Sequence, residues 1–396
     1  FGGWITDHWG WHWVFWVNLP VALVALVAVI YALPRVQAER RVHVDWLGSA
    51  LLVAGLMPIL LAFTWAGSSY AWSSPQIIGL FAGGLLLLGA FAWQEARQDE
   101  PIIWPGLFKN ELFTSSLVVM LLTNMGMFGA IMFLPLFVQG VMGLAAQQSG
   151  LVTTPMMLSF IVGSVITGQL MSRTGRYKTY AHVSAAIVIL GMYLLRSMGV
   201  ATTQAELIRN VVILGIGIGS LMPVLNVSVQ NAFPYRMLGQ VNAGQQFVSS
   251  LAGVVAAPIL STVMTNRVTS ELPQRLGPQL SGALAALRSN PAFAGAANPQ
   301  GMISAEAQQA MQQAFAQFGQ QGAALYQQFL TALRGSLAAG VGELYSVGFY
   351  FAIAAFVGTF FLKEIRLHGD EFFHRESESD QVADVAAELD APSPGS

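Results

Sequence analysis

The sequence predicts an all-α integral membrane protein. Hydrophobic residues make up 54% of the 396 and charged residues only 10%, and the chain also contains 40 Gly, 24 Phe and 10 Trp. A soluble domain does not need so apolar a composition, whereas helices that cross a bilayer do. The apolar residues are gathered in runs of about 20, the length that crosses a hydrocarbon core of about 30 Å.

We expect about nine complete transmembrane helices, because each apolar run is long enough to span the bilayer. The predicted spans cover about residues 13–34, 46–65, 75–95, 112–139, 150–166, 179–196, 207–230, 241–264 and 341–362. The chain begins with Phe1 rather than Met, and its first residues are typical of the end of a further helix. We therefore expect the natural protein to extend upstream of residue 1.

Charge and residue chemistry point away from several classes of function. The formal net charge of -2 argues against a nucleic-acid partner, and the absence of Cys excludes disulfides and thiolate catalysis. No span carries paired carboxylates, no His residues have metal-ligand spacing, and no phosphate loop has its lysine in a strand-helix context. We expect no enzyme activity, no metal and no cofactor, and a lipid bilayer as the surroundings.

A short basic turn, Gly168 to Lys178, separates two predicted spans. It reads Gly-Gln-Leu-Met-Ser-Arg-Thr-Gly-Arg-Tyr-Lys, and such basic turns face the cytoplasm. The turn resembles the signature loop of the major facilitator superfamily, in the copy found in the second half of those transporters. The resemblance implies a gating role for Gly168, Arg173, Gly175, Arg176 and Lys178, and Ser172 stands where the family has an acid. A plain orientation anchor is the alternative.

The first residues resemble a narrower family, the fourteen-span drug:proton antiporters of the EmrB/QacA type. The resemblance rests on Gly-Gly-Trp-Ile-Thr-Asp at residues 2–7 and on Trp-x-Trp-x-Phe-x-x-Asn-Leu-Pro at 11–20. Gly2 and Gly3 would close the antiporter motif of that family. The pattern Leu-Pro-Leu-Phe-Val-Gln, followed by a glycine at Gly143, supports the same assignment.

This resemblance implies the domain organisation. Residues 1–34 would end the first six-helix half, with the end of span 5 and all of span 6, and 35–111 would hold cytoplasmic linkers and two inserted spans. Residues 112–363 would form the second six-helix half with an outer loop at 266–340, and 364–396 a disordered cytoplasmic tail. The glycines Gly79 and Gly83 permit close contact between the inserted spans, and Gly215-Ile-Gly-Ile-Gly219 predicts close helix packing rather than a dinucleotide loop.

The Lys and Arg residues support this topology. If the spans alternate from an outside start, most of the 18 cations lie in the cytoplasm and only Arg196 and Arg209 oppose the positive-inside rule outside the long outer loop. We expect a multi-pass protein of the inner or plasma membrane with a cytoplasmic C-terminus.

Polar and adaptable side chains within the spans are the candidate substrate-binding residues. Met and Phe adapt to many apolar shapes, and amides can satisfy a polar group without demanding one charge. The candidates are Asn124, Phe128, Met156, Met157, Met222, Asn226, Gln245, Gln246 and Ser249. Ordinary helix packing is the alternative for each, and for Asn124 the choice between cavity and helix contact stays open.

In the outer loop, Met311, Phe315, Phe318, Leu325 and Phe329 recur at helical spacing. We expect this apolar stripe to lie along the outer membrane face, and docking of a partner, such as a periplasmic adaptor protein, is the alternative.

The resemblance implies secondary active export of small amphipathic compounds in exchange for protons, by alternating access. The helix at 241–264 carries amides where several family members carry acids, so we expect the coupling acid upstream of residue 1. Two alternatives remain: a carrier of the same fold for one specific metabolite, and a membrane-embedded transferase.

Overall fold

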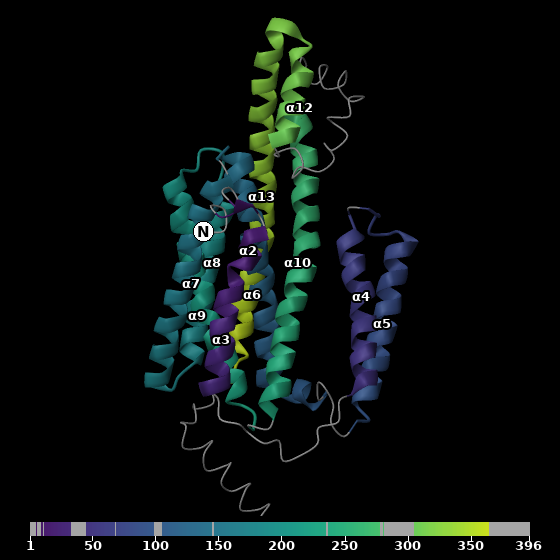
Figure 1. Cartoon of the computed structure of the whole chain (residues 1–396), viewed down its shortest axis with the longest axis vertical. Coiled ribbons are helices and arrows are strands. Elements are labelled where there is room, and N and C mark those ends of the chain that lie inside the picture. Colours follow the sequence, from purple (N-terminus) through teal and green to yellow (C-terminus); the bar gives the residue numbers. More distant parts are fainter. Residues whose placement is uncertain are drawn as a thin grey trace, which may run out of the picture.

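The computed structural model describes residues 5, 9–10, 12–32, 45–67, 69–98, 105–144, 146–234, 237–277, 280 and 305–363. All regular elements in these ranges are helices (Figure 1). Gly2, Gly3, the linker at 33–44, part of the outer loop and the tail from 364 lie outside the described residues.

The described part of the chain contains eleven α-helices and three short helices of other types. The helices are α2 (His12–Trp16), α3 (Asn18–Ala32), α4 (Trp46–Trp65), α5 (Pro75–Glu95), α6 (Glu111–Leu136), α7 (Ala146–Thr174), α8 (Lys178–Arg196), α9 (Gln204–Gln230), α10 (Leu238–Arg275), α12 (Ala305–Ala316) and α13 (Gly322–Phe360). The short helices are the 3-10 helices η1 (Pro105–Lys109) and η6 (Gly319–Gln321) and the π-helix η2 (Phe137–Val141).

Eight of these helices, α4 to α10 and α13, are long and apolar enough to cross a membrane. Together with the absence of strands from the described elements, they confirm the predicted all-α integral membrane fold. The remaining predicted span corresponds to α3, which has 15 residues and no buried side chain.

Helices α6 to α10 and α13 form one bundle. Helix α9 packs between α7 and α8, and α13 packs against α6, α8 and α10. Their shared core includes Met192, Leu214, Leu260 and Leu344, each no more than 1% exposed. In Figure 1, α4 and α5 form a separate hairpin that lies beside α10.

The glycines of α9 confirm the prediction of close helix packing. A Cβ atom added at Gly215 would lie 2.6 Å from the carbonyl oxygen of Met156 on α7, and one at Gly217 would lie 2.7 Å from the backbone nitrogen of Val188 on α8. Neither distance leaves room for a side chain, so both glycines are required where α9 meets its neighbours.

The prediction for the inserted spans was wrong about which glycines make the contact. A Cβ added at Gly79 or Gly83 would meet no atom within 4 Å. Helices α4 and α5 instead approach at Gly55 and Gly84, where a Cβ on Gly84 would lie 2.8 Å from the Gly55 carbonyl oxygen. The spacing of small residues shows that a close contact is possible, but the partner helix selects the face that is used.

The outer segment is more helical than the loop expected at 266–340. Helix α10 continues to Arg275, α13 begins at Gly322, and α12 packs against α13. Figure 1 shows these three helices extending together beyond the ends of α7, α8 and α9, and we call them the helical projection. Ion pairs from Glu271 to Arg267 (2.9 Å) and to Arg275 (3.2 Å) support the continuation of α10.

The apolar stripe faces the inside of this projection rather than a membrane. Met311, Phe315 and Phe329 are 2%, 1% and 2% exposed. The ring of Phe315 lies 5.7 Å from that of Phe329 and 5.9 Å from that of Tyr326, between ring centroids. The expectation that the stripe lies along the outer membrane face was therefore wrong, because α13 supplies the apolar partner.

Candidate functional site

Helix α10 presents an unusual set of exposed side chains within a membrane-length helix. Near its start the exposed positions are Gly239, Asn242, Ala243, Gln246 and Ser250, all small or polar. We call these five residues the polar stripe of α10. Amides are costly in hydrocarbon, so a helix with this face is expected to border water or other protein groups rather than lipid chains.

Helix α7 shows the opposite pattern, which is typical of a surface in contact with lipid. Its exposed residues include Leu158, Ile161, Val162 and Val165, at 51–58% exposure. The contrast between α7 and α10 identifies the side of α10 that carries Gln246 as the candidate wall of a polar passage.

A hydrogen bond between side chains joins α6 to α10 next to this stripe. The Nδ2 atom of Asn124 donates to the Oγ atom of Ser249 at 3.1 Å, and Asn124 is only 3% exposed. Asn124 was expected either to line a cavity or to contact another helix, and this hydrogen bond provides the contact with another helix. Because Ser249 directly precedes Ser250 of the polar stripe, this hydrogen bond also places Asn124 at the edge of the candidate passage.

Gln245 lies on the buried side of α10, at 4% exposure. Its Nε2 atom has no hydrogen-bond partner among the described residues. A buried amide donor without an acceptor costs about 1–3 kcal/mol, so this side chain has a reason to bind water or a ligand.

Helix α9 meets the stripe near the start of α10. The Nε2 atom of Gln230 donates to Oδ1 of Asn242 at 2.8 Å, and Asn226 lies about one turn earlier on α9 and is half-buried. Pro223 lies inside α9, directly after Met222, which packs partly buried against two of the apolar clusters. Thus α10 meets α9 at Asn242 and meets α6 at Ser249.

The remaining candidates have different surroundings. Phe128 is 37% exposed and its ring covers Gly253 of α10, where an added Cβ would lie 3.0 Å away. Met156 is 3% exposed and packs against α9, whereas Met157 is 41% exposed on α7 beside Leu158. The structure therefore groups Phe128 with α10 and gives Met156 a packing contact.

The basic turn is attached to the end of α13. Gly175 has a φ of +66°, which ends α7 in a conformation that favours glycine. The hydroxyl of Tyr177, which is fully buried, donates to the carbonyl oxygen of Lys363, and Nζ of Lys178 donates to that of Phe360 at 3.2 Å. Cations near the last carbonyls of a helix are favourable.

The other motif residues of the turn make no comparable contact within the part of the chain that the structure describes. Arg173 and Arg176 are exposed, and a Cβ at Gly168 would meet no atom within 4 Å. Tyr177 is the residue of this turn that sequence reasoning missed. A tyrosine within a run of polar residues at a membrane surface was the available signal.

An ion pair links the same region to α6. Nζ of Lys363 lies 2.6 Å from Oε2 of Glu111, and both side chains are exposed. The ends of α6, α8 and α13 therefore meet beside the basic turn.

The fold and this site define a polytopic helical membrane protein with an exposed polar face on a bundle of apolar helices. The family description "Major Facilitator Superfamily" matches residues 1–257. The chain belongs to the Major Facilitator Superfamily.

Several relatives share a large part of the sequence. The chain is 33% identical to the multidrug transporter protein MdtP of Bacillus subtilis (strain 168), over 99% of this chain and 71% of the relative. It is 32% identical to multidrug resistance protein 3 of the same organism, over 68% of this chain and 53% of that protein. It is 34% identical to the uncharacterized MFS-type transporter Rv1877 of Mycobacterium tuberculosis, over 72% of this chain and 41% of that protein.

Proposed function

We propose that the protein is a secondary active multidrug efflux transporter. It exports small amphipathic compounds by alternating access, in exchange for protons, across the cell membrane. Family membership and relatives named as multidrug transporters support this proposal. The local resemblance to the fourteen-span drug:proton antiporters, with α4 and α5 as the inserted pair, supports the same assignment.

The polar stripe of α10 is the observation that carries the proposal. A carrier with broad specificity needs a wall that combines apolar surface with uncharged polar groups. Gln246 and Ser250 supply the polar groups, Asn124 and Ser249 stand at the edge, and Phe128 adds an adaptable aromatic face. Gln245, Asn226 and Met222 line the same region in the proposal, and Met156 and Met157 extend it toward α7.

The cytoplasmic contacts of the basic turn support its proposed role as a gate. Lys178 and Tyr177, at the start of α8, hold the end of α13, so a movement of α8 against α13 requires these hydrogen bonds to break. Gly175 allows the close turn, Gly168 lies within α7, and Arg173 and Arg176 anchor the cytoplasmic side in the proposal. In this proposal the C-terminus lies in the cytoplasm.

The helical projection is the proposed contact for a periplasmic adaptor protein. It extends α10 and α13 beyond the rest of the bundle (Figure 1). Along α10, along α12 and along residues 322–349 of α13, no described residue is a large exposed hydrophobic side chain, which fits a surface that lies in water.

Drug accumulation in cells tests the transport function. Cells that express the protein should accumulate less of an amphipathic dye than cells without it, and Gln245→Ala with Gln246→Ala should reverse the difference for at least one substrate. Unchanged efflux of every substrate would count against the proposed wall. Export of one metabolite alone would favour a specific carrier, and turnover of a lipid-linked donor by the purified protein would favour a transferase.

Proton exchange needs a separate measurement. In proteoliposomes with an acidic interior, substrate added outside should enter in exchange for protons and dissipate the gradient, reported by a pH-sensitive dye. Transport that continues without proton movement would remove the antiport mechanism but leave the export function standing.

A further inference from the structure

A groove lies between the start of α6 and the end of α13, and no described residue of α10 lines it. Its volume is about 390 Å³, within the range of small-molecule pockets. The lining residues are Phe108 and Lys109 of η1, Glu111, Thr114, Ser115 and Val118 of α6, Gly358 of α13, and Phe361 directly after α13. Charged and polar side chains therefore gather where α6 begins, and the rest of the wall is apolar.

Close packing of α6 against α13 closes the floor of this groove. A Cβ added at Gly358 would lie 2.7 Å from Cγ2 of Val119 on α6, so no side chain fits between the two helices there. The neighbouring Val118 is 46% exposed. The groove is thus an open channel along the outside of the helix pair rather than a passage through the bundle.

The apolar part of the groove includes two exposed aromatic rings. Phe108 is 51% exposed and Phe361 is 69% exposed. Exposed apolar side chains on membrane-length helices are expected to contact lipid rather than water. This part of the groove therefore fits the acyl chain of a lipid.

The start of α6 fixes the position of Lys109 at the polar part. Oγ1 of Thr114 donates to the carbonyl oxygen of Phe108 at 2.8 Å, and Oδ1 of Asn110 accepts from the backbone nitrogen of Leu112 at 2.9 Å. These hydrogen bonds hold the backbone of η1 against α6 on both sides of Lys109. The exposed ammonium group of Lys109 is therefore attached to a firmly held segment.

The charges around the groove favour an anion. Nζ of Lys363 lies 2.6 Å from Oε2 of Glu111, so the carboxylate in the lining already has a cation beside it. Lys109 has no ion-pair partner among the described residues. Lys178 adds another cation at the end of α13, where it donates to the carbonyl oxygen of Phe360 at 3.2 Å. These three cations outnumber the one carboxylate.

An anionic phospholipid combines the two chemistries that the groove offers. Basic pockets between membrane helices bind anionic headgroups, because the phosphate is attracted to Lys and Arg near the membrane surface. A zwitterionic lipid would bring a further positive group to an end of the groove where cations are already in excess. A free anion would leave Val118 and Phe361 without an apolar partner.

We propose that the groove between α6 and α13 binds one anionic phospholipid, with its phosphate beside Lys109 and an acyl chain over Val118 and Gly358. The bound lipid bridges η1, α6 and the end of α13. The site rests on the membrane fold and not on transport. Its binding can be measured whether or not the protein exports a compound, so failure of this proposal and failure of the proposed function are distinguishable.

Photolabelling of the purified full chain in phosphatidylcholine vesicles tests the site. A phosphatidylglycerol probe and a phosphatidylcholine probe carry the same diazirine on the same acyl chain, and each is added at the same low mole fraction. Labelled peptides are mapped by mass spectrometry. We expect the phosphatidylglycerol probe to label the peptides that contain Val118 and Gly358 about fivefold more, a ratio that corresponds to about 1 kcal/mol for one lysine near an anionic headgroup.

One pair of variants tests the charge. Lys109→Gln removes the cation from the groove and should bring the ratio of the two probes close to one. Arg97→Gln removes an exposed cation at the end of α5 that does not line the groove, so it should keep the parent ratio.

A second pair of variants tests the shape. Val118→Phe fills the groove and should reduce labelling of the Gly358 peptide by the phosphatidylglycerol probe at least threefold. Val183→Phe adds the same ring at an exposed position of α8 outside the lining and should label as the parent does.

Equal labelling by the two probes in the parent would overturn the proposal, and this comparison needs no variant. A probe ratio that Lys109→Gln leaves unchanged would also contradict it, as would undiminished label on the Gly358 peptide in Val118→Phe. A phosphatidylethanolamine probe with the same acyl chain completes the test, because stronger labelling by it than by phosphatidylglycerol would show that net negative charge is not what the groove selects. Lys109 and Val118 are both exposed, so these variants should fold, and thermal unfolding checks that they do.

Discussion

The amide of Asn124 donates to the hydroxyl of Ser249 at 3.1 Å and so joins α6 to α10 beside the polar stripe. Hydrogen bonds between membrane helices contribute about 0.6 kcal/mol on average. A double-mutant cycle with Asn124→Ala and Ser249→Ala should therefore show a coupling free energy of about 0.6 kcal/mol for unfolding. Strictly additive effects would show that the two side chains do not interact in the folded protein.

The glycines of α5 give a prediction with a built-in control. Gly84→Val should destabilise the α4–α5 hairpin, because an added Cβ would lie 2.8 Å from the Gly55 carbonyl oxygen. Overpacking of this kind costs about 1–3 kcal/mol. Gly83→Val adds the same atoms where nothing lies within 4 Å and should be tolerated. Thermal unfolding of both variants makes the comparison, and equal destabilisation would contradict the assigned helix faces.

The helical projection should depend on Phe315. This side chain is 1% exposed and contacts the rings of Tyr326 and Phe329, so Phe315→Ala should cost about 3–5 kcal/mol locally. We expect faster hydrogen exchange throughout α12, measured by mass spectrometry. Gln312→Ala, at an exposed position on the same helix, should leave the exchange unchanged. Slow exchange in the Phe315 variant would mean that α12 is held in another way.

Tyr177 should anchor the end of α13. Tyr177→Phe removes the hydrogen bond to the Lys363 carbonyl oxygen and should cost about 0.5–1.5 kcal/mol. The last turn of α13 should then exchange its amide hydrogens faster, while Arg176→Ala, which changes an exposed side chain, should have no such effect. If the two variants exchange equally, the turn does not act through Tyr177.

The sequence predicted the membrane helices well because each requires a long apolar run. It placed α4 at Trp46–Trp65 and α5 at Pro75–Glu95, as the structure has them. The ends of α10 and α13 were missed because Arg267, Glu271 and Arg275 are typical of a polar loop. Their spacing of four residues, which allows the two ion pairs, was the signal that the helix continues.

The candidate site was less predictable, because burial depends on partners that sequence spacing does not identify. Gln245 and Gln246 are neighbours, yet one is 4% exposed and lacks a partner for Nε2 while the other belongs to the polar stripe. Periodicity places them 100° apart on a helix but cannot say which side meets α6 and α9. The approach of Asp45 and Glu95, whose carboxylate oxygens would lie 2.5 and 2.9 Å from a Cβ added at Gly48, was missed for the same reason, since the two residues are far apart in the chain.

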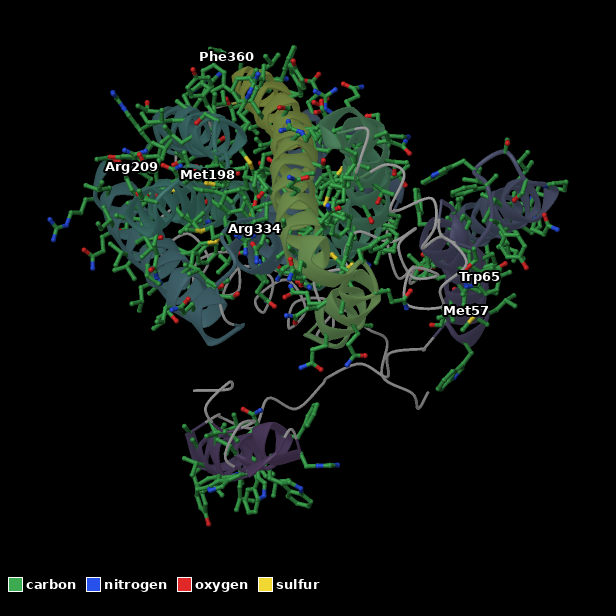
Figure 2. The ribbon with its side chains drawn as sticks, turned by 90° about the horizontal axis from the view of Figure 1, so that it is seen from above. Met57, Trp65, Met198, Arg209, Arg334 and Phe360 are labelled. Atoms are coloured by element: carbon green, nitrogen blue, oxygen red, sulfur yellow. The ribbon has the colours of Figure 1, made fainter. Side chains whose placement is uncertain are left out.

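Cysteine accessibility of the polar stripe tests the central claim most directly, and the chain has no native Cys to interfere. Gln246→Cys on α10 and Ile161→Cys on α7 are compared for reaction with a charged methanethiosulfonate reagent in membranes, with and without an amphipathic substrate. Figure 2 shows the side chains of the bundle from above. The account predicts fast reaction at position 246, slowed by substrate, and little reaction at position 161, which is 55% exposed on an apolar face. Fast reaction at 161 with none at 246 would contradict a polar passage along α10.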